Sequence, residues 1–287
     1  MSTALQTTST VQRGAGVRVV VVTGASSGIG RATALRFARG GCVVVAVART
    51  RSTLEQLQRD GPPGKIHIEA CDAGDGAAVA AMAARVQAEH GAVDVVVNSA
   101  GLGQWKYLED TAPTELATMM GAPFFAAAHV TAAFLGAMIE RGSGVILHVG
   151  SPASFQPWPG SAAYACSRFA LRGLHEALRV DLAGTGVASC HVVFGEVTSS
   201  YFDNNPGSYE HIPRVARMIP KMSPEQCAAT LWQTALHPRP EVFEPFVLQL
   251  LLWAQRMVPS VVRTLTAKTG RQREPRAVAP RELGPGS

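Results

Sequence analysis

The most informative segment of the chain reads Val19-Val20-Val21-Val22-Thr23-Gly24-Ala25-Ser26-Ser27-Gly28-Ile29-Gly30. Its four consecutive valines are typical of a strand that is buried on both faces of a sheet. The strand runs into a glycine-rich turn, and a helical pattern begins directly after it. In this arrangement Gly24 permits a tight turn, Gly28 lets a ligand approach the backbone, and Gly30 allows the helix to pack closely on the strand.

The same turn is suited to hold phosphate groups. A helix N-terminus presents unpaired N–H groups and the positive end of the helix dipole, and both attract anions. Placed after a buried strand, the pattern therefore predicts a turn that cradles the pyrophosphate of a dinucleotide. The candidate phosphate-binding residues are Gly24, Ser26, Ser27, Gly28, Ile29 and Gly30.

Short Val/Ile-rich runs alternate with helical segments as far as about residue 195. Such alternation is typical of right-handed βαβ crossovers. The sequence therefore predicts an α/β fold: a Rossmann-like, doubly wound parallel sheet with helices on both faces, in a single domain. The predicted strands are 17–23, 42–48, 66–70, 93–98, 144–149 and 187–194, and the predicted helices are 29–39, 53–59, 77–89, 114–140 and 164–182.

The ends of the chain differ in composition from this alternating part. Residues 1–16 are polar and rich in Ser and Thr, which predicts a disordered leader before a domain at 17–270. Within the domain, turn signals predict a long substrate loop at about 199–222, and residues 241–263 form a markedly apolar segment. Residues 271–287 read as a disordered tail.

Composition and charge exclude several classes of protein. The chain has 287 residues, 47% hydrophobic and 16% charged, which is too apolar for a wholly disordered chain and long enough to bury a sizeable core. Its net charge of +5 arises mostly near the C-terminus, and no basic patch interleaved with aromatic residues is found, which argues against a nucleic-acid partner. No run reaches the roughly 18 consecutive apolar residues of a membrane span.

Cysteine and histidine spacing predicts neither disulfides nor a metal site. The five cysteines are odd in number and lack a C-x-x-C pair, as expected of buried, reduced thiols in a cytoplasmic protein. No pair of histidines has ligand spacing beside a suitable carboxylate, so each is expected in the core or on the surface. These histidines are His90, His129, His148, His175 and His191.

The end of the second predicted strand bears on the type of nucleotide. A protein that prefers NAD usually carries Asp or Glu there, where the carboxylate binds the ribose 2′-hydroxyl. Residues 48–51 contain no acid, and Arg49 could pair with a 2′-phosphate, which favours NADP(H) over NAD(H); a solvated arginine is the alternative. Asp72, followed by Ala73, stands where a carboxylate could bind the adenine amino group, or it is a simple helix-start acid.

Four separated motifs together resemble the short-chain dehydrogenase/reductase family over roughly residues 17–200. They are Thr23-Gly-x-x-x-Gly-x-Gly30, Asn98-Ser99-Ala100-Gly101, Ser151, and Tyr164 thirteen residues further on. The resemblance implies a nicotinamide cofactor, hydride transfer between nicotinamide and a carbonyl or alcohol carbon, and a homo-oligomer. It also implies cofactor contacts at Asn98, Ala100, Gly101, Val197 and Thr198.

The candidate catalytic residues are Ser151, Tyr164 and Arg168. Tyr164 and Arg168 are four residues apart in a predicted helix and are therefore expected on one face of it. A free phenol ionises too weakly to serve as a base near neutral pH, and a nearby cation favours the phenolate. Tyr164 would then exchange a proton with the substrate oxygen, Ser151 would hydrogen-bond that oxygen, and Arg168 would tune Tyr164 and bind the cofactor ribose.

Several positions depart from the family pattern. Arg168 replaces the family's Lys, and Pro123 stands where the family has an Asn that feeds a proton relay. Ser99 replaces a second Asn, and Phe194 replaces a Pro. Two hypotheses follow. One is an active NADP(H)-dependent oxidoreductase, which the serine–tyrosine pair favours, and the other is a catalytically impaired NADP(H)-binding regulatory or scaffold protein.

Aromatic residues follow the carboxyl ends of the predicted strands, where doubly wound folds bind ligands. They predict an apolar pocket for a hydrophobic ketone or alcohol, with ordinary loop packing as the alternative. The apolar run 246–253 with the basic residues Arg256, Arg263 and Lys268 predicts peripheral membrane contact, or packing on another subunit or over the substrate mouth. The aromatic residues are Trp105, Phe155, Trp158, Phe202 and Tyr209.

Overall fold

Seven parallel strands form one sheet in the computed structural model, which describes residues 18–203 and 205–271. The strand order is β3-β2-β1-β4-β5-β6-β7, which confirms the predicted doubly wound fold. The predicted leader, and the predicted tail apart from Arg271, lie outside the described residues. The strands are β1 (Val19–Thr23), β2 (Val43–Ala48), β3 (Ile66–Ala70), β4 (Val95–Asn98), β5 (Gly144–Gly150), β6 (Val187–Phe194) and β7 (Glu241–Glu244).

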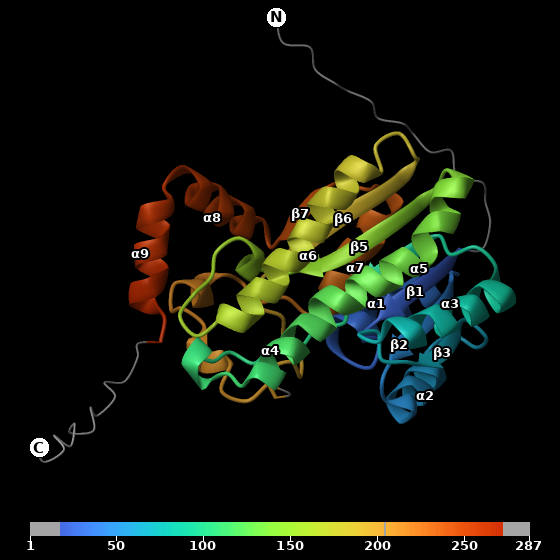
Figure 1. The fold of residues 1–287 in the computed structure, drawn as a ribbon, viewed down its shortest axis with the longest axis horizontal. Helices are drawn as coiled ribbons and strands as arrows, with labels where there is room; N and C mark the ends of the chain where they lie inside the picture. Colours follow the sequence, from blue (N-terminus) through green and yellow to red (C-terminus); the bar gives the residue numbers. More distant parts are fainter. Residues whose placement is uncertain (1–17, 204, 272–287) are drawn as a thin grey trace, which may run out of the picture.

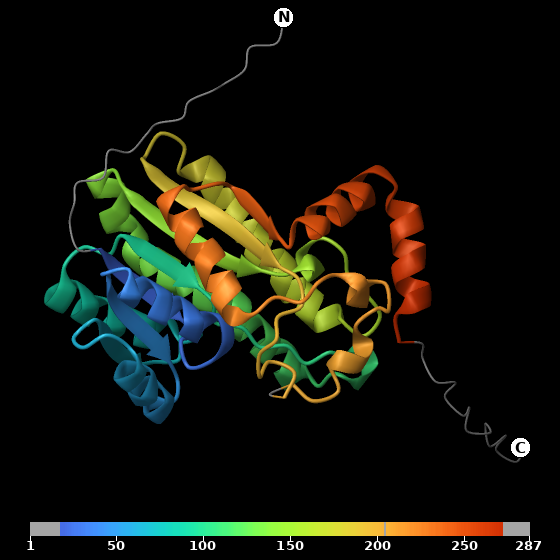
Figure 2. The ribbon, with the colours of Figure 1, turned by 180° about the vertical axis from the view of Figure 1, so that it is seen from behind.

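Helices cover both faces of the sheet (Figures 1 and 2). Val20 and Val22 of β1 point towards α1, α2 and α7, whereas Val19 and Val21 point towards α3, α5 and α6. Successive side chains of a strand alternate between the two faces, so an unbroken run of valines needs an apolar layer on each side. These helices are α1 (Gly28–Arg39), α2 (Arg51–Asp60), α3 (Gly76–His90), α5 (Ala126–Arg141), α6 (Ala162–Asp181) and α7 (Pro224–Leu236).

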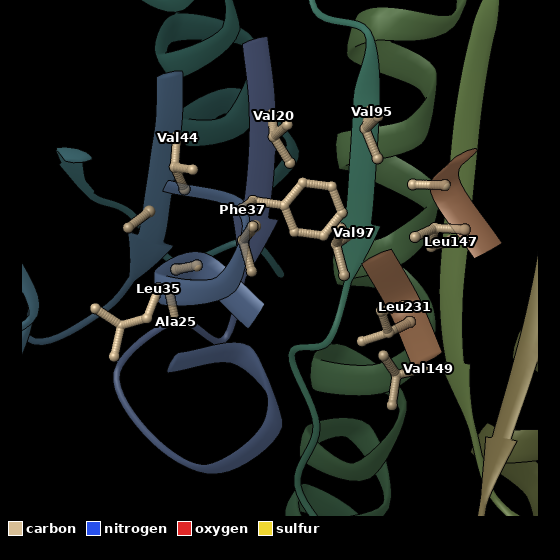
Figure 3. Packing of buried hydrophobic residues seen from close by; sticks show 14 of the residues in the cluster. Val20, Ala25, Leu35, Phe37, Val44, Val95, Val97, Leu147, Val149 and Leu231 are labelled. Carbon is tan, nitrogen blue, oxygen red and sulfur yellow. The ribbon is translucent and has the colours of Figure 1, made fainter. Parts of the chain in front are cut away.

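Phe37 of α1 lies in the middle of one of these layers (Figure 3). Its side chain is buried beside Val20 and Val97, and its ring meets the edge of Trp232 at a centroid distance of 5.1 Å. Removing a buried phenylalanine side chain typically costs about 3–5 kcal/mol of stability. This packing holds α1 against the sheet and thereby positions the glycine-rich turn at the start of α1.

The predicted apolar segment over 241–263 comprises several elements of the structure. The chain forms β7, in which Val242 pairs with Val192, followed by α8 (Phe246–Met257) and α9 (Pro259–Thr269). A strand of four residues is too short to show alternation in the sequence. The pairing with β6 places β7 at the edge of the sheet.

The predicted helix 114–140 is interrupted in the structure. α4 (Pro113–Met120) passes through a π-helical turn, Gly121–Phe125, into α5. Pro123 lies inside that turn, and a proline lacks the N–H of the helical ladder while its ring displaces the preceding turn. The wider π turn is therefore explained by the residue that replaces the family's Asn.

The combined run Pro113–Arg141 is, among the described helices, long and apolar enough to cross a membrane by length and composition. The sequence expectation counted consecutive apolar residues. A few polar residues interrupt this run, but they do not make it hydrophilic on average. Ala126, Val130, Phe134 and Met138, spaced four residues apart on α5, are buried against the sheet. This spacing identifies α5 as a core helix of the domain.

The five cysteines are free thiols. Cys42, Cys71, Cys190 and Cys227 are buried, and burial raises the pKa of Cys227 to about 12. Cys166 on α6 is exposed, which corrects the expectation that all five are buried.

Candidate active site

A cavity of about 960 Å³ lies along the carboxyl ends of the strands. Residues that follow β1 to β6 line it, because parallel strands bring these ends to one edge of the sheet. Strand order reverses between β1 and β4, and the loops leaving these two strands diverge and open a crevice there. The volume is at the upper end of the roughly 300–1,000 Å³ that small-molecule sites occupy.

Three glycines give the turn after β1 a shape that side chains would prevent. Gly24 has φ +66°, and a Cβ there would lie 2.9 Å from backbone atoms of Ala100. A Cβ on Gly30 would lie 2.2 Å from the carbonyl oxygen of Gly24, so only glycine lets α1 start this close to the turn. All six predicted phosphate-binding residues line the cavity: Gly24, Ser26, Ser27, Gly28, Ile29 and Gly30. The free N–H groups of this helix start fit a dinucleotide pyrophosphate.

Arg49 lines the cavity from the end of β2. Its side chain is exposed and has no ion-pair partner within the described residues, whereas the neighbouring Arg51 pairs with Glu55 at 3.0 Å. The guanidinium of Arg49 is therefore available to an anionic ligand group in the cavity.

Asp72 and Ala73 line the cavity from the end of β3. The carboxylate of Asp72 accepts a hydrogen bond from the N–H of Gly74 at 2.9 Å. The cap of α3 is Asp75, whose carboxylate accepts the first free N–H groups of that helix. Asp72 is thus not the capping acid, and one of its acceptor oxygens remains for a ligand.

The loop after β4 is tied to β1 by the hydroxyl of Thr23. This hydroxyl accepts hydrogen bonds from the N–H groups of Ser99 and Ala100, both at 3.1 Å. The two bonds satisfy buried backbone donors and hold Ala100 and Gly101 in the cavity wall.

Asn98 and Thr198, two predicted cofactor residues, are not among the residues that line the cavity. Asn98 is buried, and its Nδ2 donates a hydrogen bond to Thr131 Oγ1 at 2.9 Å. The hydroxyl of Thr198 donates to the carbonyl of Met222 at 3.1 Å. In both cases a partner distant in sequence holds the side chain elsewhere, whereas Val197 does line the cavity.

The structure brings Ser151, Tyr164 and Arg168 to the same cavity. Ser151 follows β5, and its Oγ accepts the N–H of Ala153 at 3.3 Å, which leaves the hydroxyl proton for another acceptor. Tyr164 is the third residue of α6 and is 5% exposed. Two hydroxyl groups and one cation thus border a common space beside the glycine-rich turn.

Arg168 is a buried cation without a carboxylate partner in the described part of the chain. Its Nη1 donates to the carbonyl of Val149 at 3.0 Å, and its guanidinium carbon lies 5.0 Å from the centroid of the Tyr164 ring. Gly101 makes room for it, because a Cβ there would lie 2.8 Å from Nη2. The buried Nε has no hydrogen-bond partner, so Arg168 retains donors for the oxygen atoms of a ligand.

Aromatic side chains surround Tyr164. The ring of Trp105 lies 5.3 Å from that of Tyr164, 5.0 Å from that of Trp158 and 5.8 Å from that of Phe202. Trp105, Trp158 and Phe202 line the cavity, as the prediction of an apolar pocket requires. The space beside the candidate catalytic hydroxyls therefore suits an apolar substrate.

Phe155 and Tyr209, the other two predicted pocket residues, lie outside the cavity lining. The guanidinium of Arg172 covers the ring of Phe155 at 3.9 Å, and Phe243 packs against the same ring at 5.5 Å. Tyr209 is partly exposed and packs edge-on against Phe202 at 5.2 Å. Contacts with other elements, which a sequence does not reveal, account for both positions.

Tyr201 is a cavity residue that the sequence did not single out. Its hydroxyl lies beside Tyr164 and Trp105. Burial, followed by the neighbouring Tyr164, raises the pKa of Tyr201 well above its ordinary value, against the opposing effect of Arg168. Tyr201 therefore stays protonated and is a poor proton acceptor.

Asn205 and Ser208 were also missed, and they join the segment 199–222 to the loop after β4. Asn205 Oδ1 accepts the N–H of Gly103 at 3.1 Å, and Asn205 Nδ2 donates to the carbonyl of Tyr201 at 2.6 Å. Ser208 Oγ donates to the carbonyl of Gly103 and accepts the N–H of Trp105. Turn residues in the sequence signal a loop here but not these contacts across about a hundred residues.

Comparison with protein-family models identifies the chain. The model described as short chain dehydrogenase matches residues 18–207, which contain β1 to β6, the glycine-rich turn and the candidate catalytic residues. The chain belongs to the short-chain dehydrogenase family. The family resemblance read from the sequence motifs is thereby confirmed.

This short-chain dehydrogenase matches two relatives over only part of their own length. A short chain dehydrogenase of Pseudocercospora fijiensis is 36% identical over 200 residues, which are 67% of this chain and 60% of that protein. The probable oxidoreductase EphD of Mycobacterium tuberculosis is 35% identical over 190 residues, 64% of this chain and 32% of that protein. The chain thus spans less than two thirds of either relative.

Solved structures of the family share the fold. A short-chain dehydrogenase from Streptomyces avermitilis has a TM-score of 0.75 at 26% identity, covering 88% of this chain and 96% of that one. A metagenomic short-chain oxidoreductase in complex with NADP has a TM-score of 0.66 at 30% identity, covering 79% and 95%.

Proposed function

We propose that this short-chain dehydrogenase is an NADP(H)-dependent oxidoreductase that transfers hydride between nicotinamide and a carbonyl or secondary alcohol of a hydrophobic substrate. The observation that carries the proposal is one cavity shared by the glycine-rich turn, the Ser151 and Tyr164 hydroxyls and the buried Arg168 cation. NADP bound to a similar oxidoreductase supports the choice of cofactor class.

The residues of the chain can handle the proton of such a reaction. When bound, nicotinamide supplies or accepts the hydride. In reduction Tyr164 donates its phenolic proton to the substrate oxygen, and in oxidation it takes that proton back. Ser151 donates a hydrogen bond to the same oxygen and orients it. The charge of Arg168 favours the phenolate left on Tyr164, and its free N–H groups can bind ribose hydroxyls.

The decisive experiment is a turnover assay with a panel of hydrophobic ketones and alcohols, combined with a titration of NADPH binding. Consumption of NADPH with at least one ketone, or its formation with an alcohol, supports the oxidoreductase. Tight NADPH binding without turnover across the panel supports the catalytically impaired regulatory protein instead.

Arg49 is proposed to select NADP(H) by pairing with the 2′-phosphate. We expect Arg49→Glu to raise the dissociation constant of NADPH about 10- to 100-fold, the value of one or two charge-assisted hydrogen bonds, and to leave that of NADH nearly unchanged. Isothermal titration with both cofactors measures this. Arg51→Glu is the matched control, because Arg51 pairs with Glu55 within α2 and does not line the cavity. Equal affinity of the parent protein for both cofactors would remove Arg49 from this role.

Arg168 is proposed to act through its charge and not through its specific shape. We expect Arg168→Lys to retain turnover within about tenfold, whereas Arg168→Met, which keeps an unbranched side chain but removes the cation, lowers it about 100-fold or more. Steady-state rates of the three proteins, with NADPH affinity measured alongside, test this. Equal rates for the parent and Arg168→Met would show that the cation has no part in the reaction.

We also propose a homo-oligomer in the cytoplasm, with peripheral membrane contact through the C-terminal segment and without a nucleic-acid partner. The family resemblance supports the oligomer and the composition supports the other points. Analytical ultracentrifugation of the purified chain tests the oligomeric state.

A further inference from the structure

The helices α8 and α9 stand away from the sheet and its covering helices (Figures 1 and 2). Phe246, Leu250, Trp253 and Met257 follow one another on α8 at intervals of three or four residues, so they form one stripe along the helix. All four are exposed, Phe246 to 65% and Trp253 to 63%, whereas Leu248 on the other side is buried. The stripe therefore faces away from the body of the domain.

The apolar surface continues onto α9. Val261 and Leu265 share one face of that helix and are likewise exposed, as is Val258 at the junction of α8 and α9, while Thr266 is buried. Single exposed apolar residues are common on protein surfaces, but a contiguous set of this size marks a binding surface. We call this set the C-terminal apolar face: Phe246, Leu250, Trp253, Met257, Val258, Val261 and Leu265.

Charge distinguishes the possible partners of this face. The sequence from Pro245 to Arg271 contains no Asp or Glu, and Arg256, Arg263 and Lys268 lie among the apolar residues. Arg256 follows Trp253 by three residues and so borders the stripe on α8. An apolar face on two helices whose only charged residues are basic fits a surface that is apolar inside and anionic outside.

A second copy of the chain fits this surface less well. In a symmetric dimer the same patch meets itself, which would bring the basic residues of one copy towards those of the other without an acid on either helix. Trp253 at 63% exposure is also the type of side chain that concentrates at the boundary between lipid and water.

The helices are too short to cross a bilayer. α8 has 12 residues and α9 has 11. At 1.5 Å per residue each is about 18 Å long, against a hydrocarbon core of about 30 Å. A helix pair of this length with one apolar face lies in the plane of the interface.

We infer that the C-terminal apolar face docks on an anionic lipid bilayer, and that the docked helix pair brings the substrate cavity next to the membrane. The helix pair is joined to the cavity through the segment 199–222. Arg271, just after α9, pairs with Glu210 at 2.6 Å and accepts a hydrogen bond on its carbonyl from Tyr107 Oη, and Arg214 N donates to the carbonyl of Thr269. Glu210 and Arg214 belong to the segment 199–222, parts of which line the cavity. The docking develops the membrane contact proposed above and does not depend on the oxidoreductase activity, whereas entry of a lipid-soluble substrate from the bilayer rests on that activity.

The test is flotation of the full chain with vesicles. The parent protein is expected to float with vesicles of phosphatidylcholine containing phosphatidylglycerol, and several-fold less with phosphatidylcholine alone. Leu250→Asp/Trp253→Asp, which alters two exposed positions, should lower the bound fraction at least about tenfold. Arg256→Glu/Arg263→Glu should abolish the preference for the anionic vesicles. Val180→Asp is the matched control, because Val180 is an exposed apolar residue of α6, 76% exposed, outside the face.

NADPH titration of each variant provides a separate reading of folding and of the proposed function. Variants that bind NADPH as the parent does but no longer float support docking, whether or not a substrate is found. Failure of the parent protein to float with either vesicle overturns the inference. Ultracentrifugation that shows the face variants dissociating a parent oligomer, with no lipid binding by the parent, would assign the face to a second copy and overturn it equally.

Discussion

Replacing Tyr164 by Phe is expected to lower kcat about 1,000-fold, as the loss of a general acid typically does. The dissociation constant of NADPH should change by less than about threefold, since the variant loses one hydroxyl group and keeps the ring. That ring is held by Trp105 at 5.3 Å and by the guanidinium of Arg168 at 5.0 Å, and neither contact involves the hydroxyl. Steady-state reduction of a hydrophobic ketone and a fluorescence titration with NADPH measure the two quantities.

Tyr201→Phe is the matched control for this experiment. It removes a second buried phenol hydroxyl from the same cavity, but the raised pKa of Tyr201 makes it a weak proton donor in the reduction. We expect it to lower kcat by less than about tenfold. Equal losses in the two variants, or full turnover in Tyr164→Phe, would show that the proton is transferred by another group.

Acidification is expected to destabilise the fold strongly because three histidines of β5, α6 and β6 are buried together. The ring of His175 lies 6.1 Å from that of His148 and 5.6 Å from that of His191, and all three side chains are buried. Burial lowers the pKa of His148 to about 3 and that of His175 to about 4, and it also holds the pKa of His191 well below its ordinary value.

Other charges around the cluster raise or lower the pKa values of its histidines. Glu176 works against the lowering at His175, while Arg172 and Arg179 add to it. Arg168 and Arg172 also lower the pKa of His191. Burial is nevertheless the first cause for each histidine, so the cluster is neutral in the folded protein over the physiological range.

The sign of the effect follows from proton linkage. The unfolded chain binds protons at these histidines below about pH 6.5, whereas the folded chain resists protonation until about pH 4 or lower, so stability is full above pH 6.5 and falls as the pH drops. At pH 5 His148 and His175 each lower the free energy of unfolding by about 2 kcal/mol, or about 4 kcal/mol together. His191 acts in the same direction. Against a typical total of about 5–15 kcal/mol this loss is large.

Urea unfolding at about pH 7.5 and pH 5 measures how much the free energy of unfolding falls on acidification. His175→Gln should reduce the pH dependence by about 2 kcal/mol, because Gln does not titrate and can still bond Ser189 Oγ, which lies 2.9 Å from His175 Nδ1. His237→Gln is the control at an exposed position and should leave the pH dependence unchanged. A free energy of unfolding that stays constant between the two pH values would contradict the burial of neutral histidines.

Features that depend on residues close together along the chain could be predicted from the sequence. The run of valines, the spacing of Gly24, Gly28 and Gly30, and the interval between Tyr164 and Arg168 each act within one or two turns of chain. Backbone preferences and hydrophobic periodicity operate at that range, so strands, helices and the shared face of Tyr164 and Arg168 follow from them.

The orientation of single side chains was harder to predict. Asn98 and Thr198 sit at the expected places along the chain, yet Thr131 and Met222 bind their polar groups. The short strand β7 likewise needs β6 beside it before it has a register. Such partners are supplied by packing and not by the local sequence.

Local sequence therefore determined the kind of fold, the glycine-rich turn and the candidate catalytic groups, since chain stiffness and side-chain periodicity are properties of short segments. The folded arrangement decided which of those groups share the cavity, placed Tyr201 beside Tyr164, and exposed an apolar face on α8 and α9. These outcomes depend on contacts between segments more than a hundred residues apart, and their energies exist only once the chain is packed.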